Sequence, residues 1–214
     1  MKPYYQDKWV TIYHGDCREV LPELAEKSVD LVLTDPPYGV EKAKWDDTFL
    51  NSTYWLPIRE SMKDDSSILV FTGLKGLPQK LYLLASCFEY QWVLSWYKSN
   101  AMQFGKTGFT KGDLIFWFSK GSRTIATKEN DVIVTPMGMP EDFLGHPTAK
   151  PQRLISNLIG RFNSAIILDP FLGSGTTCYC AKKLLRKSIG IEIEERYCEI
   201  AARRCSQEVM ELTE

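Results

Sequence analysis

The stretch "TDPPYGV", residues 34–40, places an acid, two prolines and an aromatic ring directly after the apolar run "VDLVL". The proline pair fixes two φ angles and offers no N–H donor, so the Asp35 carboxylate and the Pro36 carbonyl are two acceptors held in place. Tyr38 adds a flat apolar surface beside them. A turn needs only one proline, and an acid is unfavourable in a buried core. A simple proline turn after the strand is the alternative.

A second stretch, "LDPFLGSGTT" at 168–177, has the composition of a strand that turns sharply into a helix. Gly173 and Gly175 allow the backbone to approach a ligand closely, and the helix start offers unpaired N–H groups. Glu192 follows nineteen residues after Gly173, where an acid can bind ribose hydroxyls. Cys178 stands where a dinucleotide fingerprint needs its third glycine, which disfavours a pyrophosphate. A nucleoside site is predicted, with a tight turn as the alternative.

These loops must be positioned by strands that alternate with helices. That alternation predicts an α/β fold with a doubly wound, mostly parallel sheet, in which ligands bind beyond the carboxyl ends of the strands. From 91 to 134 strand follows strand, which predicts an antiparallel edge or hairpin. Strands are expected at 9–13, 28–34, 66–72, 91–97, 113–119, 131–134, 164–169 and 188–193, and helices at 17–27, 77–88, 151–162, 176–187 and 194–212.

Length and composition predict one domain over residues 1–214, with 44% hydrophobic residues for its core. The net charge of −1 argues against a globally basic nucleic-acid coat and leaves room for a local patch. Six scattered cysteines without a secretory leader predict a reduced, cytoplasmic protein. The apolar runs are too short to span a bilayer, so no membrane attachment is expected, and no metal site is predicted.

In combination, "GDCREVL" at 15–21, "TDPPYG" at 34–39, "HPTAKP" at 146–151 and "LDPFLGSGTT" at 168–177 resemble the amino-methylating DNA methyltransferases, which act on adenine N6 or cytosine N4. The order resembles the β arrangement, in which the catalytic motif precedes the cofactor motif. The resemblance covers nearly the whole chain. It implies a circularly permuted, Rossmann-like fold and S-adenosyl-L-methionine as cofactor.

The resemblance also implies roles for individual residues. Asp16 would contact the adenine of the cofactor, and Glu192 would bind its ribose. The alternative for Asp16 is a helix cap, and the alternative for His146 is a turn residue without a chemical role. The implied cofactor site comprises Asp16, Cys17, Asp35, His146, Thr148, Lys150, Asp169, Pro170, Phe171, Gly173, Ser174, Gly175, Thr176, Thr177 and Glu192.

For the catalytic motif Asp35, Pro36, Pro37 and Tyr38, the implied substrate is an exocyclic amine. Such an amine is a poor nucleophile, and two acceptors on its hydrogens favour a tetrahedral nitrogen. The base must leave the duplex, and Tyr38 would stack on it. Aspartate rather than serine at position 35 favours adenine N6. Cytosine N4, an RNA amine and a non-catalytic binding subunit are the alternatives.

DNA contacts are expected in loops within 98–145, because six cations between Trp96 and Lys128 face a single acid, Asp113. A solvated loop with ordinary lysines is the alternative. The short distance between "FSKG" and "GHPTAKP" leaves no room for a large recognition domain. A homodimer, a partner restriction nuclease and a specificity subunit are open alternatives for the assembly. The predicted DNA-contacting residues are Lys42, Lys98, Lys106, Lys111, Lys120 and Arg123.

Overall fold

The computed structural model describes residues 1–37, 53–101, 103–105, 108–121, 127–137 and 149–207. Their centre is a nine-stranded sheet with the order β1-β2-β11-β10-β3-β4-β8-β5-β9. Its strands are β1 (Tyr5–Gln6), β2 (Val10–His14), β3 (Val29–Thr34), β4 (Met62–Thr72), β5 (Glu89–Lys98), β8 (Gly112–Lys120), β9 (Val132–Thr135), β10 (Ile166–Asp169) and β11 (Lys187–Glu192).

The sheet is mostly parallel, as predicted. β2, β11, β10, β3 and β4 pair in parallel, and β9 pairs in parallel with β5. β8 is antiparallel to both β4 and β5, which confirms an antiparallel region after residue 91. The carboxyl ends of β10 and β3 therefore lie side by side. From this point the chain moves one way through β3 and β4 and the other way through β10 and β11, so the strand order reverses here.

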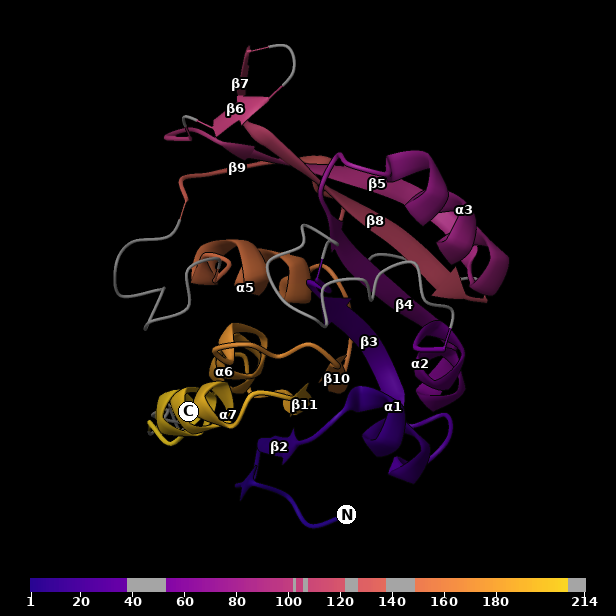
Figure 1. Ribbon diagram of the computed structural model, residues 1–214, viewed down its shortest axis with the longest axis vertical. Coiled ribbons are helices and arrows are strands. Elements are labelled where there is room, and N and C mark those ends of the chain that lie inside the picture. Colours follow the sequence, from indigo (N-terminus) through magenta and orange to yellow (C-terminus); the bar gives the residue numbers. More distant parts are fainter. Residues whose placement is uncertain (38–52, 102, 106–107, 122–126, 138–148, 208–214) are drawn as a thin grey trace.

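Helices cover both faces of this sheet (Figure 1). α1, α2 and α3 pack on one face around Trp55 and Phe116, while α5 and α6 pack on the other around Phe162, and α7 covers β2. The helices are α1 (Cys17–Val20), α2 (Trp55–Ser61), α3 (Leu77–Cys87), α5 (Gln152–Gly160), α6 (Thr176–Lys183) and α7 (Glu195–Cys205), with a 3₁₀ turn at Leu21–Glu23.

Several elements differ from the sequence-based expectation. The helix expected over 17–27 ends at Val20, and a 3₁₀ turn that contains Pro22 follows it. α2 was not predicted because Pro57 interrupts its short sequence, yet a proline in the first turn is tolerated and Trp55 and Ile58 are buried. A hairpin of β6 (Gln103–Gly105) and β7 (Gly108–Thr110) extends beyond β5 and β8 (Figure 1).

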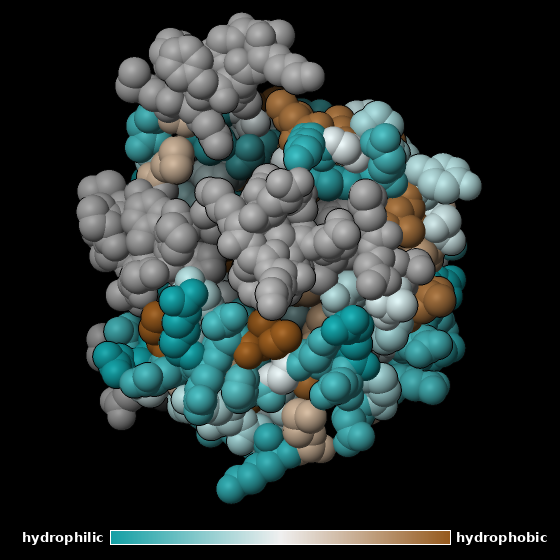
Figure 2. All heavy atoms as spheres, in the orientation of Figure 1, coloured by the Kyte–Doolittle hydropathy of each residue, from teal (hydrophilic) through white to brown (hydrophobic). Residues whose placement is uncertain are grey.

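The described helices are all too short or too polar to cross a bilayer. On the face seen in Figure 2, the described residues in the lower half of the molecule are mostly hydrophilic, and hydrophobic residues form small separate patches.

Candidate active site

The two loops that carry the candidate functional residues, at 34–40 and 168–177, begin side by side where the strand order of the sheet reverses. Asp35 directly follows β3, and Asp169 ends the neighbouring strand β10. The hydroxyl of Thr34 donates a hydrogen bond of 2.9 Å to Oδ1 of Asp169. The end of the catalytic strand is therefore tied to the start of the glycine-rich loop by a buried contact.

Lys150 is the direct partner of Asp35. Its ammonium donates a short hydrogen bond to Oδ2 of Asp35 and lies 5.0 Å from the centre of the Phe71 ring. Side-chain exposure is 12% for Lys150 and 25% for Asp35, so the pair is shielded from bulk water. The resemblance implies a place for Lys150 in the cofactor site, whereas the fold places its ammonium on the Asp35 carboxylate.

Asp169 is a buried acid with an unusual pKa. Burial raises the pKa of its carboxyl to about 6, although hydrogen bonds from Thr177, Thr34 and the Phe171 N–H oppose the rise. A small change in its surroundings can therefore change its charge near neutral pH. Such groups are typical of functional sites.

The glycine-rich loop has a conformation that needs glycine. Gly175 is the N-cap of α6 with φ of +80°, and a Cβ there would lie 2.7 Å from the Cβ of Ala201 on α7. Gly173 also has a positive φ, of +53°. Arg204 of α7 donates to the Ser174 carbonyl and to the Thr176 hydroxyl at 3.2 and 2.7 Å. Ser174 and Thr176 therefore hold the loop against α7.

Glu192 ends β11 beside this loop. Its carboxylate accepts hydrogen bonds from the N–H groups of Gly173 at 2.7 Å and Glu194 at 2.8 Å. Burial raises its pKa, and these two donors oppose the rise. A carboxylate has about four acceptor positions, so this one can still accept from hydroxyl groups. The loop, the glycines and the acid fit a nucleoside with a ribose.

Asp16 does cap a helix. Its side chain accepts from the Arg18 N–H at 2.9 Å at the start of α1 and also binds the Arg18 guanidinium. That guanidinium lies 5.3 Å from the Tyr54 ring, which meets the Phe171 ring edge-on at 5.7 Å. Asp16 is thus connected to Phe171 through Arg18 and Tyr54, two residues that the sequence did not indicate. Cys17 is the first residue of α1 and is buried in the core.

Lys80 is another residue of this region that the sequence did not indicate. It is 3% exposed on α3; burial lowers its pKa, and the charge of Asp35 acts in the opposite direction. Its spacing of four residues from the buried Leu84 could have revealed it, because residues i and i+4 share a helix face.

Of the predicted DNA-contacting residues, the structure describes Lys98, Lys111 and Lys120, and these three lie in different surroundings. Lys111 is exposed at the start of β8, beside the carboxyl edge, and lies 6.0 Å from the Tyr97 ring. Lys98 is 4% exposed and its ammonium is paired with Asp113 at 3.0 Å. Lys120 lies at the opposite edge, where it donates to the backbone carbonyls of Arg59 and Met62. Both ammonium groups thus have partners within the protein, and the phosphate contacts expected for Lys98 and Lys120 stay predictions.

Within the segment 98–145, β8 is the strand expected at 113–119, and the DNA-contacting loops expected around it stay a prediction. Pro36 is buried and Pro37 is half-buried after β3, and Pro170 is buried after β10. The predicted site residues outside the described residues are Tyr38, Lys42, Lys106, Arg123, His146 and Thr148.

Comparisons with known proteins identify relatives of this chain. The sequence model of a family described as DNA methylase matches residues 29–203. The Type II methyltransferase M2.DpnII of Streptococcus pneumoniae is 26% identical, over 97% of this chain and 93% of the relative. M.HinfI of Haemophilus influenzae is 29% identical, over 95% of this chain and 70% of the relative.

Solved structures show the same fold. The PvuII DNA methyltransferase, described as cytosine-N4-specific, superposes with a TM-score of 0.80 at 22% identity, over 98% of this chain and 91% of that one. The M1.HpyAVI–SAM complex superposes with a TM-score of 0.75 at 24% identity, over 92% of this chain and 100% of that one.

Proposed function

The chain belongs to the DNA methylase family whose model matches residues 29–203, and we propose that it methylates the N6 amine of adenine in DNA. Methyl transfer to an exocyclic amine of DNA is the activity of the family, and S-adenosylmethionine is its cofactor. The choice of adenine is our proposal, based on the aspartate at position 35.

The observation that carries this function is the contact between the two loops. Asp35, which can accept hydrogen bonds from an amine, and Asp169, beside the glycine-rich loop, are joined through Thr34 at the reversal point of the sheet. A base acceptor and a nucleoside site must be adjacent if a group is to pass between their ligands.

The residues around the glycine-rich loop fit the cofactor. When bound, S-adenosylmethionine supplies a methyl group on a positively charged sulfur. Glu192 would accept from its ribose hydroxyls, and Asp169 offers a buried acceptor for its positively charged amine. Phe171, next to Tyr54, offers an aromatic surface, and the positive φ angles of Gly173 and Gly175 keep the backbone open.

At the base, Asp35 and the Pro36 carbonyl would accept from the two amine hydrogens. This directs the nitrogen lone pair outward and offers the released proton an acceptor in Asp35. Tyr38 would stack on the extrahelical base and offset part of the unstacking cost, which is about a few kcal/mol.

A methylation assay with identification of the modified nucleoside tests this function. The protein is incubated with labelled S-adenosylmethionine and duplex DNA, RNA or protein, and the products are analysed by nucleoside mass spectrometry. N6-methyladenine is the expected product. N4-methylcytosine would overturn the choice of base, and label in RNA or protein alone would overturn the substrate.

The matched variants are Asp35→Asn and Asp64→Asn. Asp64 is an exposed acid on β4, at the opposite edge, where it pairs with Lys27. Asp35→Asn is expected to abolish labelling and Asp64→Asn to leave it unchanged. If Asp35→Asn labels DNA as well as the wild type does, the proposed role of Asp35 is wrong.

The cellular location and the protein partners stay predictions. DNA is the substrate of the family, whereas a homodimer, a partner restriction nuclease, a specificity subunit and a cytoplasmic location are expectations from the sequence and the resemblance. Light scattering of the purified protein would measure its oligomeric state directly.

A further inference from the structure

The last strand of the sheet has an open edge. β9 pairs with β5 and with no other strand among the described residues. The Ser95 N–H donates to the Asp131 carbonyl at 2.8 Å, and the alternation of a parallel ladder then turns the N–H and C=O groups of Val132 and Val134 outward. Such an edge is a template for another strand.

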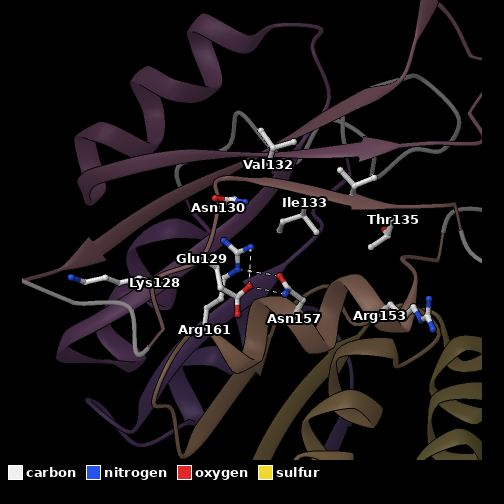
Figure 3. A pocket seen from close by; sticks show the side chains of 10 residues that line it. Lys128, Glu129, Asn130, Val132, Ile133, Thr135, Arg153, Asn157 and Arg161 are labelled. Carbon is white, nitrogen blue, oxygen red and sulfur yellow. Dashed lines mark hydrogen bonds and ion pairs between the residues drawn. The ribbon is translucent and has the colours of Figure 1, made fainter.

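A groove of about 520 Å³ runs along this edge, between β9 and α5 (Figure 3). All four residues of β9 line it, as expected if the groove follows the edge of the strand and not one of its faces. The opposite wall is a polar stripe, Arg153, Asn157 and Arg161, spaced four residues apart along α5 and its C-cap. The groove therefore has the shape and polarity to hold an extended chain.

Arg161 provides a buried donor in this groove. Its side chain is 3% exposed; Nε donates to Asn157 at 3.0 Å and Nη2 lies 3.3 Å from Glu129. Nη1 has no hydrogen-bond partner in the part of the chain that the structure describes. Burial also lowers the pKa of Arg161, against the charge of Glu129. A ligand oxygen at this point of the groove would satisfy this donor.

The charges of the groove indicate the chemistry of that ligand. Lys128 and Arg153 are exposed at its rim, so three cations, with Arg161, face the single carboxylate of Glu129 among the lining residues. An acidic segment would complement this surplus.

A peptide fits the groove better than a nucleic acid does. The free edge of β9 presents carbonyl oxygens as well as N–H groups, and a phosphate can only accept hydrogen bonds. A peptide both donates and accepts in the alternation that the edge requires. We propose that an extended acidic segment of a partner protein binds in this groove as an added strand on β9.

Selection from a phage-displayed library of random octapeptides tests the proposal on the full chain. Peptides rich in Asp and Glu and free of proline are expected to be enriched. Fluorescence anisotropy with a synthetic peptide of the enriched sequence then measures affinity. Failure to enrich any sequence, or enrichment of basic sequences, overturns the proposal.

Variants locate the binding. Val134→Pro removes an outward N–H without removing a bond to β5, and is expected to weaken peptide binding at least tenfold, whereas Val134→Thr keeps the edge and the affinity. Arg153→Glu should also weaken binding, with Arg196→Glu on α7 as its control. The proposal is overturned if Arg153→Glu and folded Val134→Pro both bind the peptide as tightly as the wild type does. It is also overturned if a single-stranded oligonucleotide competes for the site as well as the unlabelled peptide does.

Discussion

Lys150 and Asp35 form a pair of opposite charges at the catalytic position. An ammonium on Oδ2 fixes the orientation of the carboxylate, and Phe71 limits where that ammonium can lie. Lys150 therefore acts as a positioning residue for Asp35. Positioning errors of about 1 Å can cost roughly 100-fold in rate.

Replacement of this lysine tests that role. Lys150→Met is expected to lower kcat for DNA methylation by about 10- to 100-fold, because Asp35 loses its anchor, with smaller effects on KM. Lys150→Arg should restore part of the loss, since it keeps the cation. Steady-state kinetics measure both. Lys183→Met, on α6, is the control, and an unchanged kcat in Lys150→Met would rule out the positioning role.

Asp169 makes stability depend on pH. Its folded pKa of about 6 lies above the ordinary value of 3.8, so the folded state binds more protons between these values. The cost of the buried charge is absent below pH 3.8 and develops fully as the pH rises through 6, where it reaches about 3 kcal/mol.

Asp169→Asn removes this cost and keeps an acceptor for Thr34. Relative to the wild type, the variant is expected to gain stability steadily as the pH rises from 4 to 7, by up to about 3 kcal/mol. Urea unfolding at several pH values measures the difference. A difference that stays constant over this range would contradict the raised pKa.

At the scale of elements, the contact between the glycine-rich loop and α7 sets the shape of the cofactor site. Gly175 lies against the backbone and side chain of Ala201, and Arg204 of the same helix binds the loop twice. α7 is thus part of the site although it carries none of the predicted ligands.

Two glycine substitutions distinguish the effect of this contact on stability from the effect of helix propensity. Gly175→Ala is expected to lower the free energy of unfolding by at least about 2 kcal/mol, because it combines a positive φ with the clash at Ala201. Gly160→Ala, at the end of α5, meets no atom within 4 Å and should raise it by about 0.5–1 kcal/mol. Urea unfolding compares the two, and equal effects would contradict the packing argument.

At the scale of the whole molecule, the proposed function predicts that DNA approaches the carboxyl edge of the sheet. The β6–β7 hairpin projects beyond this edge, and Lys111 stands exposed at its base. The chain is nearly neutral overall, with a net charge of −1, so such local cations have to attract the phosphates.

Charge reversal at the two edges tests this geometry. Lys111→Glu is expected to weaken DNA binding and to reduce the slope of log K against log salt by about 1, because one phosphate contact is lost. Lys187→Glu, exposed at the amino end of β11, should change neither quantity. Fluorescence anisotropy at several salt concentrations measures both, and equal effects would place the DNA elsewhere.

The sequence by itself determined most strands, most helices, the parallel sheet and the two loops at 34–40 and 168–177. Those features depend on local periodicity and on the residues a turn requires, such as the prolines at 36 and 37 and the glycines at 173 and 175. Their resemblance to the family added the reaction and the cofactor.

The tertiary structure decided which side chains meet. It brought Lys150 onto Asp35 and connected Asp16 to Phe171 through Arg18 and Tyr54. It also paired Lys98 with Asp113 and joined Lys120 to the Met62 carbonyl. It also placed β9 at an open edge facing α5. Such contacts join residues far apart in the chain, and spacing along one sequence carries no information about strand order or the partner of a charge.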